Sequence, residues 1–442
     1  MRKLGGGEKL AKKVVHVDEF VDIIGPACKM LGPVEDKGTI IVDASEPACW
    51  GPMITPEVPS GHTVTRPVAV EGAEVGDGIA IKVKKIKVLS KATASGTETG
   101  RAGSFVGDPY VAKKCPGCGT INPKTYQKGI GKDAIRCKKC DTPVSSFDVT
   151  CGYTMLFDET GKIGVTVPKN VAESIAKQAY EYAAMPPKAL TYPVLVLAMS
   201  DMPGGVVARV RPMLGQVGTT PAVNMPCSHN AGDFGVFLVG APHDYKLTDQ
   251  TELLKRTDAH MDIDSVREGA IVIAPVKLDG GGVCIGDVHA MQGDGEIAGH
   301  TTDIVAEVTT EVEIIKNLGI DGPILLPNKE DLPPLAQLYT SDELKIAQGL
   351  AAKYGFELEA NVAPLQIVGS GANLNEAAMN GLERMAKLVG MDLNEVRNRV
   401  TITGAVEIGR LPGIVQVTML APLKRLEEIG IAHLVRQQYF TS

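Results

Sequence analysis

The chain is poor in aromatic side chains and has no long apolar segment. Phe, Trp and Tyr make up 4% of its 442 residues, whereas 49 glycines and 28 prolines supply many turns. This balance is typical of short strands joined by tight turns. The longest apolar runs, such as residues 192–199, fall far short of the roughly 20 residues that cross a bilayer. We therefore expect a β-rich protein with no membrane partner.

The chain also lacks an excess of positive charge. It has 45 Lys and Arg residues against 52 Asp and Glu residues, and a formal net charge of −7 at pH 7. Nucleic-acid binding needs a basic surface that neutralises phosphates, and this composition offers no such field. Neither a GxxxxGK[ST] loop nor a convincing GxGxxG turn is present to hold a phosphate group. We expect no nucleic-acid partner.

The N-terminal twenty residues lack the features of an export signal. They are basic, but they have no continuous apolar core and no small-residue cleavage site. The nine cysteines are an odd number, and four of them have the spacing of metal ligands. Cysteines used in this way are typical of a protein in a reducing compartment, and not of a disulfide framework. We expect a cytoplasmic protein.

The strongest motif is a pair of CxxC sequences. Cys115 and Cys118 are followed, after eighteen intervening residues, by Cys137 and Cys140. This is the spacing of a zinc ribbon, in which four thiolates complete a tetrahedral site with no open position. A closed site cannot activate water, so we expect a structural zinc that folds a small insertion. The alternative is a binding finger, which the nearby lysines would assist, although lysines also offset the charge of a thiolate cluster.

The hydrophobic pattern predicts strands first and helices later. Alternating apolar and polar residues predict strands in 38–88 and at 304–314, and the Ser, Thr and Gly content of 89–110 predicts a loop. A capping-box-like start at Asn170 predicts a helix that runs to Met185. Together these patterns favour a mixed, β-rich α+β fold.

Beyond the Pro-rich stretch 322–335, capping signals at Thr340 and Asn373 predict two helices, and a strand pair closes the chain. Four parts are expected: residues 1–110 as the N-terminal β-rich part of a body, 111–150 as an inserted zinc ribbon, 151–325 as the β-rich remainder that carries the active site, and 326–442 as a C-terminal α/β portion.

The segment GVCIGDVHAMQGDGEIAGH (282–300) is crowded with groups that bind metals and move protons. Period-two alternation places Asp287 and His289 on one face of a strand, and Asp294-Gly295 predicts a hairpin turn. The returning strand would bring Glu296 beside Asp287 and His289. Taken singly, each residue has a simpler role in a turn or in a hydrogen bond. Their density favours a functional site.

An upstream segment repeats the pattern. His260, Asp262 and Asp264 alternate with Met261 and Ile263, as on a strand with one buried face. Mixed imidazole and carboxylate ligands suit zinc or another divalent ion and commonly leave a position open for water. We expect a second, catalytic metal site here.

Other candidates are weaker. Ser228 and His229 could form a nucleophile and base, but sequence neighbours rarely do so and the GxSxG pattern is absent. Cys227 and Cys284 could be nucleophiles, although small buried cysteines are more often part of the core.

Four stretches, in order along the chain, resemble the acetamidase/formamidase family of amide hydrolases. They are HTVTRPVAVEGAEVGDGIAIKV (62–83), HMDIDSVREGA (260–270), IGDVHAMQGDGEIAG (285–299) and the closing segment 375–422, which begins NEAAMNGLERMAKLVG. The resemblance covers most of the chain outside 89–160. The cysteine ribbon is an addition to the family pattern.

The resemblance implies a β-sandwich-like body with an α/β portion, assembly into homo-oligomers, and divalent metal sites. It also implies hydrolysis of formamide or acetamide to the acid and ammonia. The matching positions are Asp43, His62, Asp262, Asp287, His289, Gln292, Asp294 and Glu296. Where the family usually has a histidine, two glycines and an asparagine, this chain reads Thr257-Asp-Ala-His260. Two interpretations stay open: His260 is a replacement ligand, or the site is altered enough to change the substrate.

The predicted mechanism uses a divalent ion, zinc by preference. Its predicted ligands are Asp43, His62, His260, Asp262, Asp287 and His289. The ion would polarise the amide carbonyl and lower the pKa of water. Glu296 would take the water's proton and pass it to the leaving nitrogen. Asp294 is a further catalytic candidate, because it matches the family signature. Gln292 or main-chain amides of the turn would steady the oxyanion, an interaction worth roughly 3 kcal/mol.

Two alternatives remain open at this stage. The first is hydrolysis of a larger amide or a cyclic imide. The second is a non-enzymatic protein that binds its partner through the zinc ribbon.

Overall fold

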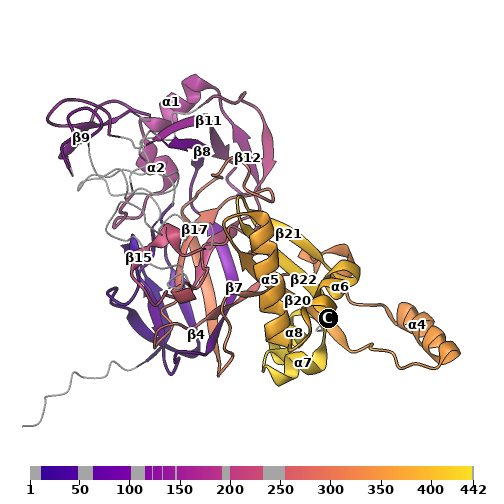
Figure 1. The fold of residues 1–442 in the computed structure, drawn as a ribbon. Helices are drawn as coiled ribbons and strands as arrows, with labels where there is room; N and C mark the ends of the chain where they lie inside the picture. Colours follow the sequence, from indigo (N-terminus) through magenta and orange to yellow (C-terminus); the bar gives the residue numbers. More distant parts are fainter. Residues whose placement is uncertain are drawn as a thin grey trace, which may run out of the picture.

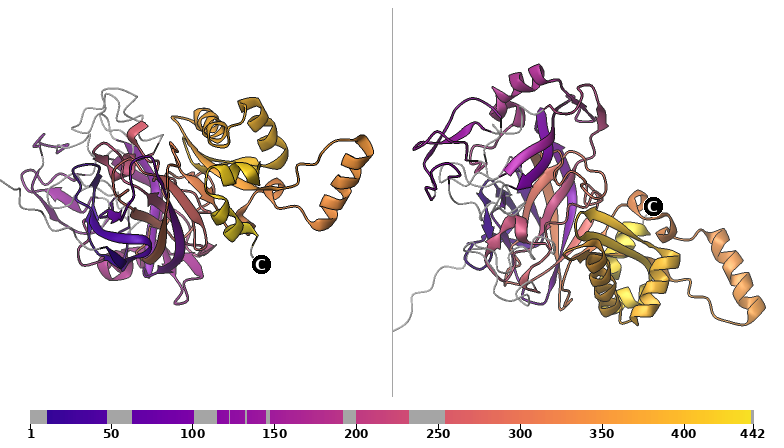
Figure 2. Two further views of the ribbon diagram at one scale, coloured as in Figure 1. Left: turned by 90° about the horizontal axis from the view of Figure 1, so that it is seen from below. Right: turned by 45° about the horizontal axis from the view of Figure 1, so that its top comes forward.

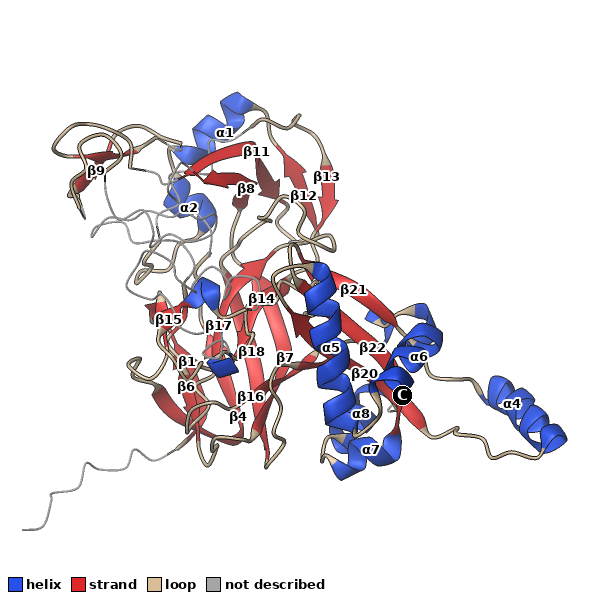
Figure 3. Ribbon diagram, viewed as in Figure 1, coloured by secondary structure: helices blue, strands red, loops and turns tan. Residues whose placement is uncertain are grey.

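The molecule consists mainly of strands, and most of its long helices lie in the C-terminal third (Figures 1 and 3). The computed structural model describes residues 11–47, 63–100, 115–121, 123–131, 133–144, 147–191, 200–231 and 254–440. The predicted mixed, β-rich α+β class is confirmed.

A ten-stranded mixed sheet runs through the molecule in the order β1-β4-β18-β7-β16-β19-β20-β22-β21, and β6 pairs with β4. Its strands are β1 Lys12–Val17, β4 Leu31–Val42, β6 Val68–Val70, β7 Gly78–Val88, β16 Ile271–Pro275, β18 Ala306–Ile315, β19 Ile324–Leu326, β20 Val362–Ser370, β21 Ala405–Arg410 and β22 Ile414–Pro422. The expected boundary at 325 falls inside β19. N-terminal and C-terminal strands are therefore joined by one hydrogen-bonded sheet.

A second sheet of four strands carries part of the site. It consists of β14 Met213–Gly218, β17 Cys284–His289, β5 Val64–Thr65 and β2 Phe20–Val21, and a short pair, β3 Ile23–Ile24 with β15 Met225–Pro226, lies apart from it. Leu214 and Val288 of this sheet share one buried cluster with Ile81 and Val308 of the large sheet. The apolar faces of the two sheets thus meet in the main core, as in a sandwich.

A third sheet lies beside the cysteine-bearing unit. It contains β8 Ala92–Gly100, β11 Phe147–Phe157, β12 Ile163–Thr166 and β13 Val207–Arg209. The unit itself has the strand pair β9 Thr125–Gln127 and β10 Ile135–Cys137. Cys115 and Ile135 pack with Ala172 and Ile175 of the adjoining helix. The small unit therefore shares a core with its neighbours.

Two predictions in this region are wrong. Residues 92–100 form strand β8, because β11 supplies a full antiparallel partner to this Thr-rich segment. The helix expected from Asn170 to Met185 is two short helices, α1 Lys169–Ala176 and α2 Ala179–Ala183. The predicted capping box is absent, since the N-cap is Pro168 and no side chain caps the helix.

The C-terminal helices pack on the large sheet. They are α5 Leu374–Val389, α6 Leu393–Thr403, α7 Leu423–Glu428 and α8 Ala432–Tyr439. Helix α5 lies across β20 and β22 (Figure 1). Its predicted start is confirmed, because the Asn373 side chain accepts from the Glu376 amide at 3.1 Å, and Gly390 ends it with φ of 61°. None of the described helices combines the length and apolar character needed to cross a membrane.

Helix α4, Ser341–Tyr354, extends away from the body on two extended segments (Figures 1 and 2). The predicted capping box is confirmed: the Thr340 amide donates to Glu343 Oε2 at 2.7 Å, and the Glu343 amide donates to Thr340 Oγ1 at 3.3 Å. Two single turns of 3₁₀ helix, Lys329–Asp331 and Pro334–Ala336, precede it. Ala351 is the one buried residue among those that form α4. We call residues 335–356 the arm.

Candidate active site

Five buried polar residues meet at the end of β17. Asp287 and His289 belong to β17, His260 and Asp262 come from the segment that lies beside β14, and Asp303 ends the loop that follows β17. Each of the five residues is at most 2% exposed. We call these five residues the carboxylate–histidine cluster.

The cluster consists of two ligand sets that share Asp287. In the first set, His260 Nε2 lies 3.0 Å from both Asp262 Oδ2 and Asp287 Oδ2. In the second set, His289 Nε2 lies 3.0 Å from Asp287 Oδ1 and 3.1 Å from Asp303 Oδ1. Each oxygen of the Asp287 carboxylate thus faces one histidine. The donor atoms in each set are close enough to share one ion.

Hydrogen bonds outside the cluster fix the orientation of both histidines. His260 Nδ1 lies 3.0 Å from the main-chain oxygen of Ser228, and His289 Nδ1 lies 3.0 Å from Gln292 Oε1. Because both partners are acceptors, each Nδ1 carries a proton and donates it. When the ring is neutral, the Nε2 lone pair then points into the cluster, which is the arrangement that metal-binding histidines adopt.

The charges in the cluster call for a cation. Burial lowers the pKa of His260, but the Asp262 and Asp287 carboxylates outweigh it and raise this pKa to about 10. For His289, the Asp287 and Asp303 carboxylates outweigh burial in the same way and raise the pKa well above its usual value. Asp262 Oδ1 is buried and accepts no hydrogen bond from the residues that the structure describes. Buried carboxylates this close together need compensating positive charge, which divalent ions or protonated histidines provide.

The backbone at the site is unusual. The backbone φ angles of Asp262, Asp287 and Glu296 are 49°, 51° and 42°. These values lie in the left-handed region, which residues other than Gly rarely adopt. Such conformations persist where the surrounding structure holds them and are concentrated at functional sites. At this site the left-handed conformations direct the carboxylates into the cluster, whereas the extended backbone of a regular strand would direct them elsewhere.

This backbone corrects two predictions. No hairpin follows β17: residues 290–303 form an irregular loop, and Asp303, not Glu296, pairs with His289 across it. Residues 261–263 form no strand, and Asp264 leaves the cluster to pair with Arg211 at 2.7 Å. Period-two reasoning fails at both places because it assumes extended φ at every residue.

Glu296 approaches the cluster from the loop. Its side chain is buried, and burial raises the pKa of its carboxyl to about 8. The Asp262 charge adds to this rise, whereas His289 and Arg410 oppose it. A carboxyl that titrates near neutral pH beside candidate metal ligands has the properties of a general base or acid.

The other predicted residues lie elsewhere or have different contacts. Gln292 uses Nε2 to donate to the main-chain oxygens of Asp262 and Gly409, and its Oε1 faces His289, so its carboxamide positions the cluster. Asp294 is exposed on the loop. Asp43 is 54% exposed and pairs with His16 at 2.8 Å, so the structure does not bring it into the cluster. His62 lies outside the described residues.

Sequence reasoning missed three residues of the site. Asp303 completes the second ligand set. Arg410, the last residue of β21, places Nε 2.8 Å from Asp262 Oδ2 and donates from Nη2 to the main-chain oxygen of His260 at 3.2 Å. Gly215 of β14 forms a wall of the cluster. The dense segment 282–300 gave a weak signal for the nearby Asp303, but no local pattern marks Arg410 or Gly215.

Gly215 must lack a side chain. A Cβ there would lie 2.4 Å from Asp262 Oδ1 and 2.7 Å from the main-chain oxygen of Asp287. We expect Gly215→Ala to displace a ligand and to lower kcat/KM for amide hydrolysis about 100-fold. The control is Gly293→Ala on the neighbouring loop, because nothing lies within 4 Å of its Cβ position. Equal activity of the two variants would contradict the placement of Gly215.

Three further carboxyl groups influence one another next to the cluster. Burial raises the pKa of Glu407 to about 7, and the charges of Asp294 and Asp264 add to this effect. Because the folded state binds this proton more tightly, the ionised carboxyl destabilises the fold, fully above pH 7 and progressively less as pH falls toward the usual Glu value.

We expect Glu407→Gln to increase the free energy of unfolding at pH 8 by about 1 kcal/mol after solvent screening. At pH 5 the gain should be much smaller, since Glu407 is then protonated in the folded protein. Urea unfolding at both pH values measures this difference. Glu383→Gln on the exposed face of α5 is the control, with no pH-dependent gain expected.

The four ribbon cysteines come together as predicted. Cys115 Sγ lies 3.5 Å from Cys140 Sγ, and Cys118 Sγ lies 3.9 Å from Cys137 Sγ. A tetrahedral zinc with Zn–S bonds of about 2.3 Å separates its sulfurs by about 3.8 Å, so the cluster fits one ion. A hydrogen bond with Thr120 lowers the pKa of Cys118 to about 6, which favours the thiolate.

The weaker nucleophile candidates are deeply buried. Burial raises the pKa of Cys284 to about 12 and raises that of Cys227 well above its usual value, and both side chains belong to a small apolar cluster. Neither thiol is poised to ionise. Ser228 Oγ lies 2.7 Å from His229 Nδ1, so this pair is in contact, and the Ser228 carbonyl also holds His260.

Comparison with known proteins supports the resemblance. The acetamidase/formamidase family model matches residues 44–254 and 246–425. A predicted acetamidase/formamidase from the thermophile Thermoanaerobacter tengcongensis is 16% identical with a TM-score of 0.52, and the alignment covers 95% of this chain and 98% of that one. Acetamidases from Yersinia enterocolitica and Bacillus halodurans are each 15% identical with a TM-score of 0.50, covering 92% and 94% of this chain and 92% and 99% of theirs. At these identities the structures share the fold. No curated protein matches the chain.

Proposed function

Because the chain belongs to the acetamidase/formamidase family and is an amidohydrolase, we propose that it hydrolyses short linear amides of the formamide or acetamide class at the carboxylate–histidine cluster. The observation that carries the proposal is the pair of ligand sets that share Asp287, with the buried Glu296 beside them. The products are the carboxylic acid and ammonia.

The cluster would hold two divalent ions, zinc by preference. His260 and Asp262 would hold one, His289 and Asp303 the other, and Asp287 would contact both. Their fit rests on the outward hydrogen bonds of both Nδ1 atoms and on the unsatisfied Asp262 Oδ1. When bound, such ions supply Lewis acidity toward the amide carbonyl and make water more acidic. A third zinc would occupy the ribbon in a structural role.

Residues of the chain carry the proton transfers. Glu296 would accept the proton of the attacking water at its carboxylate and return it to the leaving nitrogen, so that ammonia departs without a net change in Glu296. Arg410 would hold the Asp262 carboxylate in place through the ion pair at 2.8 Å. Gln292 would act as a positioning residue that fixes the His289 ring. Main-chain amides of the loop, and not Gln292, would then stabilise the oxyanion.

Ammonia release tests the function directly. Formamide, acetamide, propionamide and a cyclic imide are assayed with one protein sample whose metal content is also measured. We expect release from the short linear amides and about three zinc equivalents per chain. Release from the cyclic imide alone would favour the larger-amide alternative. No release from any of the four would favour a binding protein that uses the ribbon.

The expected self-association has a candidate surface in the arm. Ile346, Leu350 and Tyr354 of α4, and Phe356 after it, are between 53% and 68% exposed. Helix α4 stands apart from the other described elements (Figures 1 and 2). A 14-residue helix with a single buried residue is marginal in water. We propose that the arm packs on a second copy of this chain, because reciprocal exchange of two arms covers both by symmetry.

The area involved is sufficient for this role. Two such arms and the surfaces that receive them would bury on the order of 1,000–2,000 Å² in total, the range of stable interfaces. We expect Ile346→Asp combined with Leu350→Asp to convert the assembly into monomers in sedimentation analysis. The control is Ile402→Asp, since Ile402 is 70% exposed on α6 of the body. A monomeric wild-type protein would refute the exchange.

A further inference from the structure

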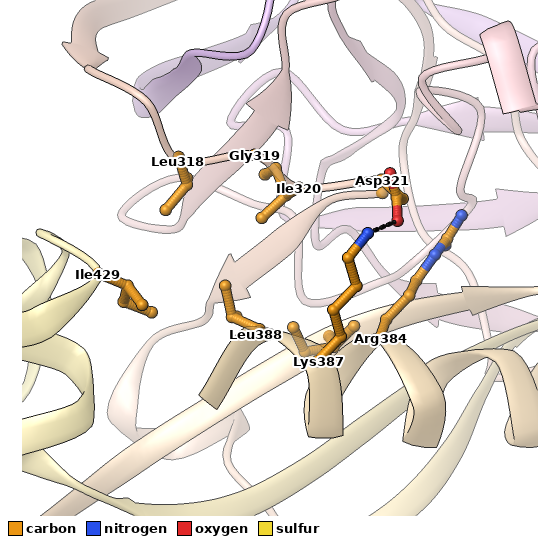
Figure 4. Close-up of a pocket in the computed structure, with 10 residues that line it drawn as sticks. Leu318, Gly319, Ile320, Asp321, Arg384, Lys387, Leu388 and Ile429 are labelled. Atoms are coloured by element: carbon orange, nitrogen blue, oxygen red, sulfur yellow. Dashed lines mark hydrogen bonds and ion pairs between the residues drawn. The ribbon is translucent and has the colours of Figure 1, made fainter. Parts of the chain in front are cut away.

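A second cavity, separate from the carboxylate–histidine cluster, lies between α5 and the loop after β18. Its volume is about 120 Å³ (Figure 4). The residues that line it are Leu318, Gly319, Ile320, Asp321, Gly322, Ile367, Arg384, Lys387, Leu388 and Ile429. None of them belongs to the cluster, to the ribbon or to the arm. The proposed reaction leaves this cavity without a role.

One side of the cavity carries an excess of positive charge. Lys387 Nζ lies 2.6 Å from Asp321 Oδ2, and Lys277 Nζ lies 3.9 Å from Asp321 Oδ1. Arg384 Nη2 lies 2.7 Å from Asp258 Oδ2. Arg256 Nη1 also lies 3.8 Å from Asp258 Oδ1, so four cations face two carboxylates and positive charge is in excess. Burial lowers the pKa of Lys277, and although Asp321 opposes this, the charges of Arg384 and Lys387 add to it, as expected where anions are too few.

Arg384 is held rigidly beside the cavity. Nη1 donates to the main-chain oxygen of Val368 at 2.8 Å, and Nη2 donates to Asp258. Gly322 permits this placement, because a Cβ there would lie 2.3 Å from Nη1. The fixed guanidinium places positive charge at this end of the cavity, where it attracts an anion.

The opposite side of the cavity is apolar. Leu318, Ile320, Leu388 and Ile429 surround the space beside the Lys387–Asp321 pair (Figure 4). A site with fixed polar groups at one end and aliphatic walls at the other selects a ligand of the same character. The volume of about 120 Å³ lies below the roughly 300–1,000 Å³ of pockets for drug-sized ligands, so the ligand is small.

We propose that this cavity is a binding site for a short-chain aliphatic carboxylate. The carboxylate would face Arg384 and Lys387, and its alkyl chain would lie against Leu388 and Ile429. The assignment of a carboxylate ligand depends only on the geometry and charge of the cavity. Short-chain carboxylates are also the product class of the proposed reaction, so the site would sense product. This second step rests on the proposed function.

The site has a direct connection to the active centre. Asp258, which Arg384 holds, is buried with φ of 53° and also accepts from Ser370 Oγ at 2.8 Å. It lies two residues before His260 in the chain. An anion on Arg384 competes with Asp258 for the guanidinium. We therefore expect occupancy to act on the segment that carries His260.

Calorimetric titration of the metal-loaded protein with butyrate tests the proposal, with 1-butanol as the neutral probe of similar size. We expect butyrate to bind and butanol not to. Lys387→Met should weaken butyrate binding at least tenfold and leave ammonia release from amides unchanged. Lys387 is exposed on its outer side, so the variant should fold. Lys424→Met, on the exposed face of α7, is the control and should bind butyrate as the wild type does.

Three results would overturn the proposal. One is the absence of butyrate binding at tens of millimolar, and another is equal binding of butanol. The third is binding that survives Lys387→Met but disappears in Asp287→Asn, which would place butyrate in the active site. Amide hydrolysis is measured separately, so failure of the proposed function and failure of the carboxylate site give different results.

Discussion

Asp287→Asn should remove both candidate ions from the cluster and lower amide hydrolysis by about a thousand-fold or more. Asp287 is the residue that both ligand sets share, with one oxygen 3.0 Å from His260 Nε2 and the other 3.0 Å from His289 Nε2. Asn has nearly the same shape but carries no charge and only one acceptor oxygen. The variant therefore tests the charge and the bridging geometry, with little change in packing.

Metal content measured on the same sample makes this test specific. The ribbon cysteines are unchanged in the variant, so about one zinc per chain should remain while the other two are lost. Asp264→Asn is the matched control, because Asp264 lies in the same segment as Asp262 but pairs with Arg211 outside the cluster. A variant Asp287→Asn that retains its metal and its activity would show that the reaction occurs elsewhere.

The ribbon and the caps at Thr340 and Asn373 could be predicted because their signals are local. Each CxxC turn brings two sulfurs together within four residues, and Thr340 needs only Glu343 three residues later. Strands β7 and β18 of the large sheet were also predictable from their alternation. Strand β8 was missed because its Ser, Thr and Gly residues become a strand only when β11 pairs with them.

The candidate site was proposed from its residue types, and its geometry could not be predicted. Asp287, His289 and Glu296 do come together, but through left-handed residues and an irregular loop instead of a hairpin. The loop is held by distant pairing: Gly295 donates to Gly409 at 3.1 Å and accepts from Leu411 at 3.0 Å. The same pairing brings Arg410 to Asp262. Contacts between segments more than 100 residues apart leave no periodic trace in either one.

The roles of the loop carboxylates are separated by Glu296→Gln. The sequence assigned chemistry to both Glu296 and Asp294, whereas the structure buries the first beside Asp262 and exposes the second. We expect Glu296→Gln to lower kcat by 10²- to 10⁴-fold, because the amide cannot accept the proton of the attacking water. Asp294→Asn, two residues away on the same loop, should change kcat by about twofold at most.

The metal content of each variant shows whether a loss of activity comes from loss of the general base or from loss of the metal. Glu296 belongs to neither ligand set, so Glu296→Gln should keep all of its metal, in contrast to Asp287→Asn. Ser228→Ala completes the comparison, because the Ser228–His229 pair at 2.7 Å is the remaining arrangement that could supply a nucleophile. An inactive Ser228→Ala together with an active Glu296→Gln would assign the reaction to a serine nucleophile. An active Ser228→Ala together with an inactive Glu296→Gln would identify water as the nucleophile and Glu296 as its base.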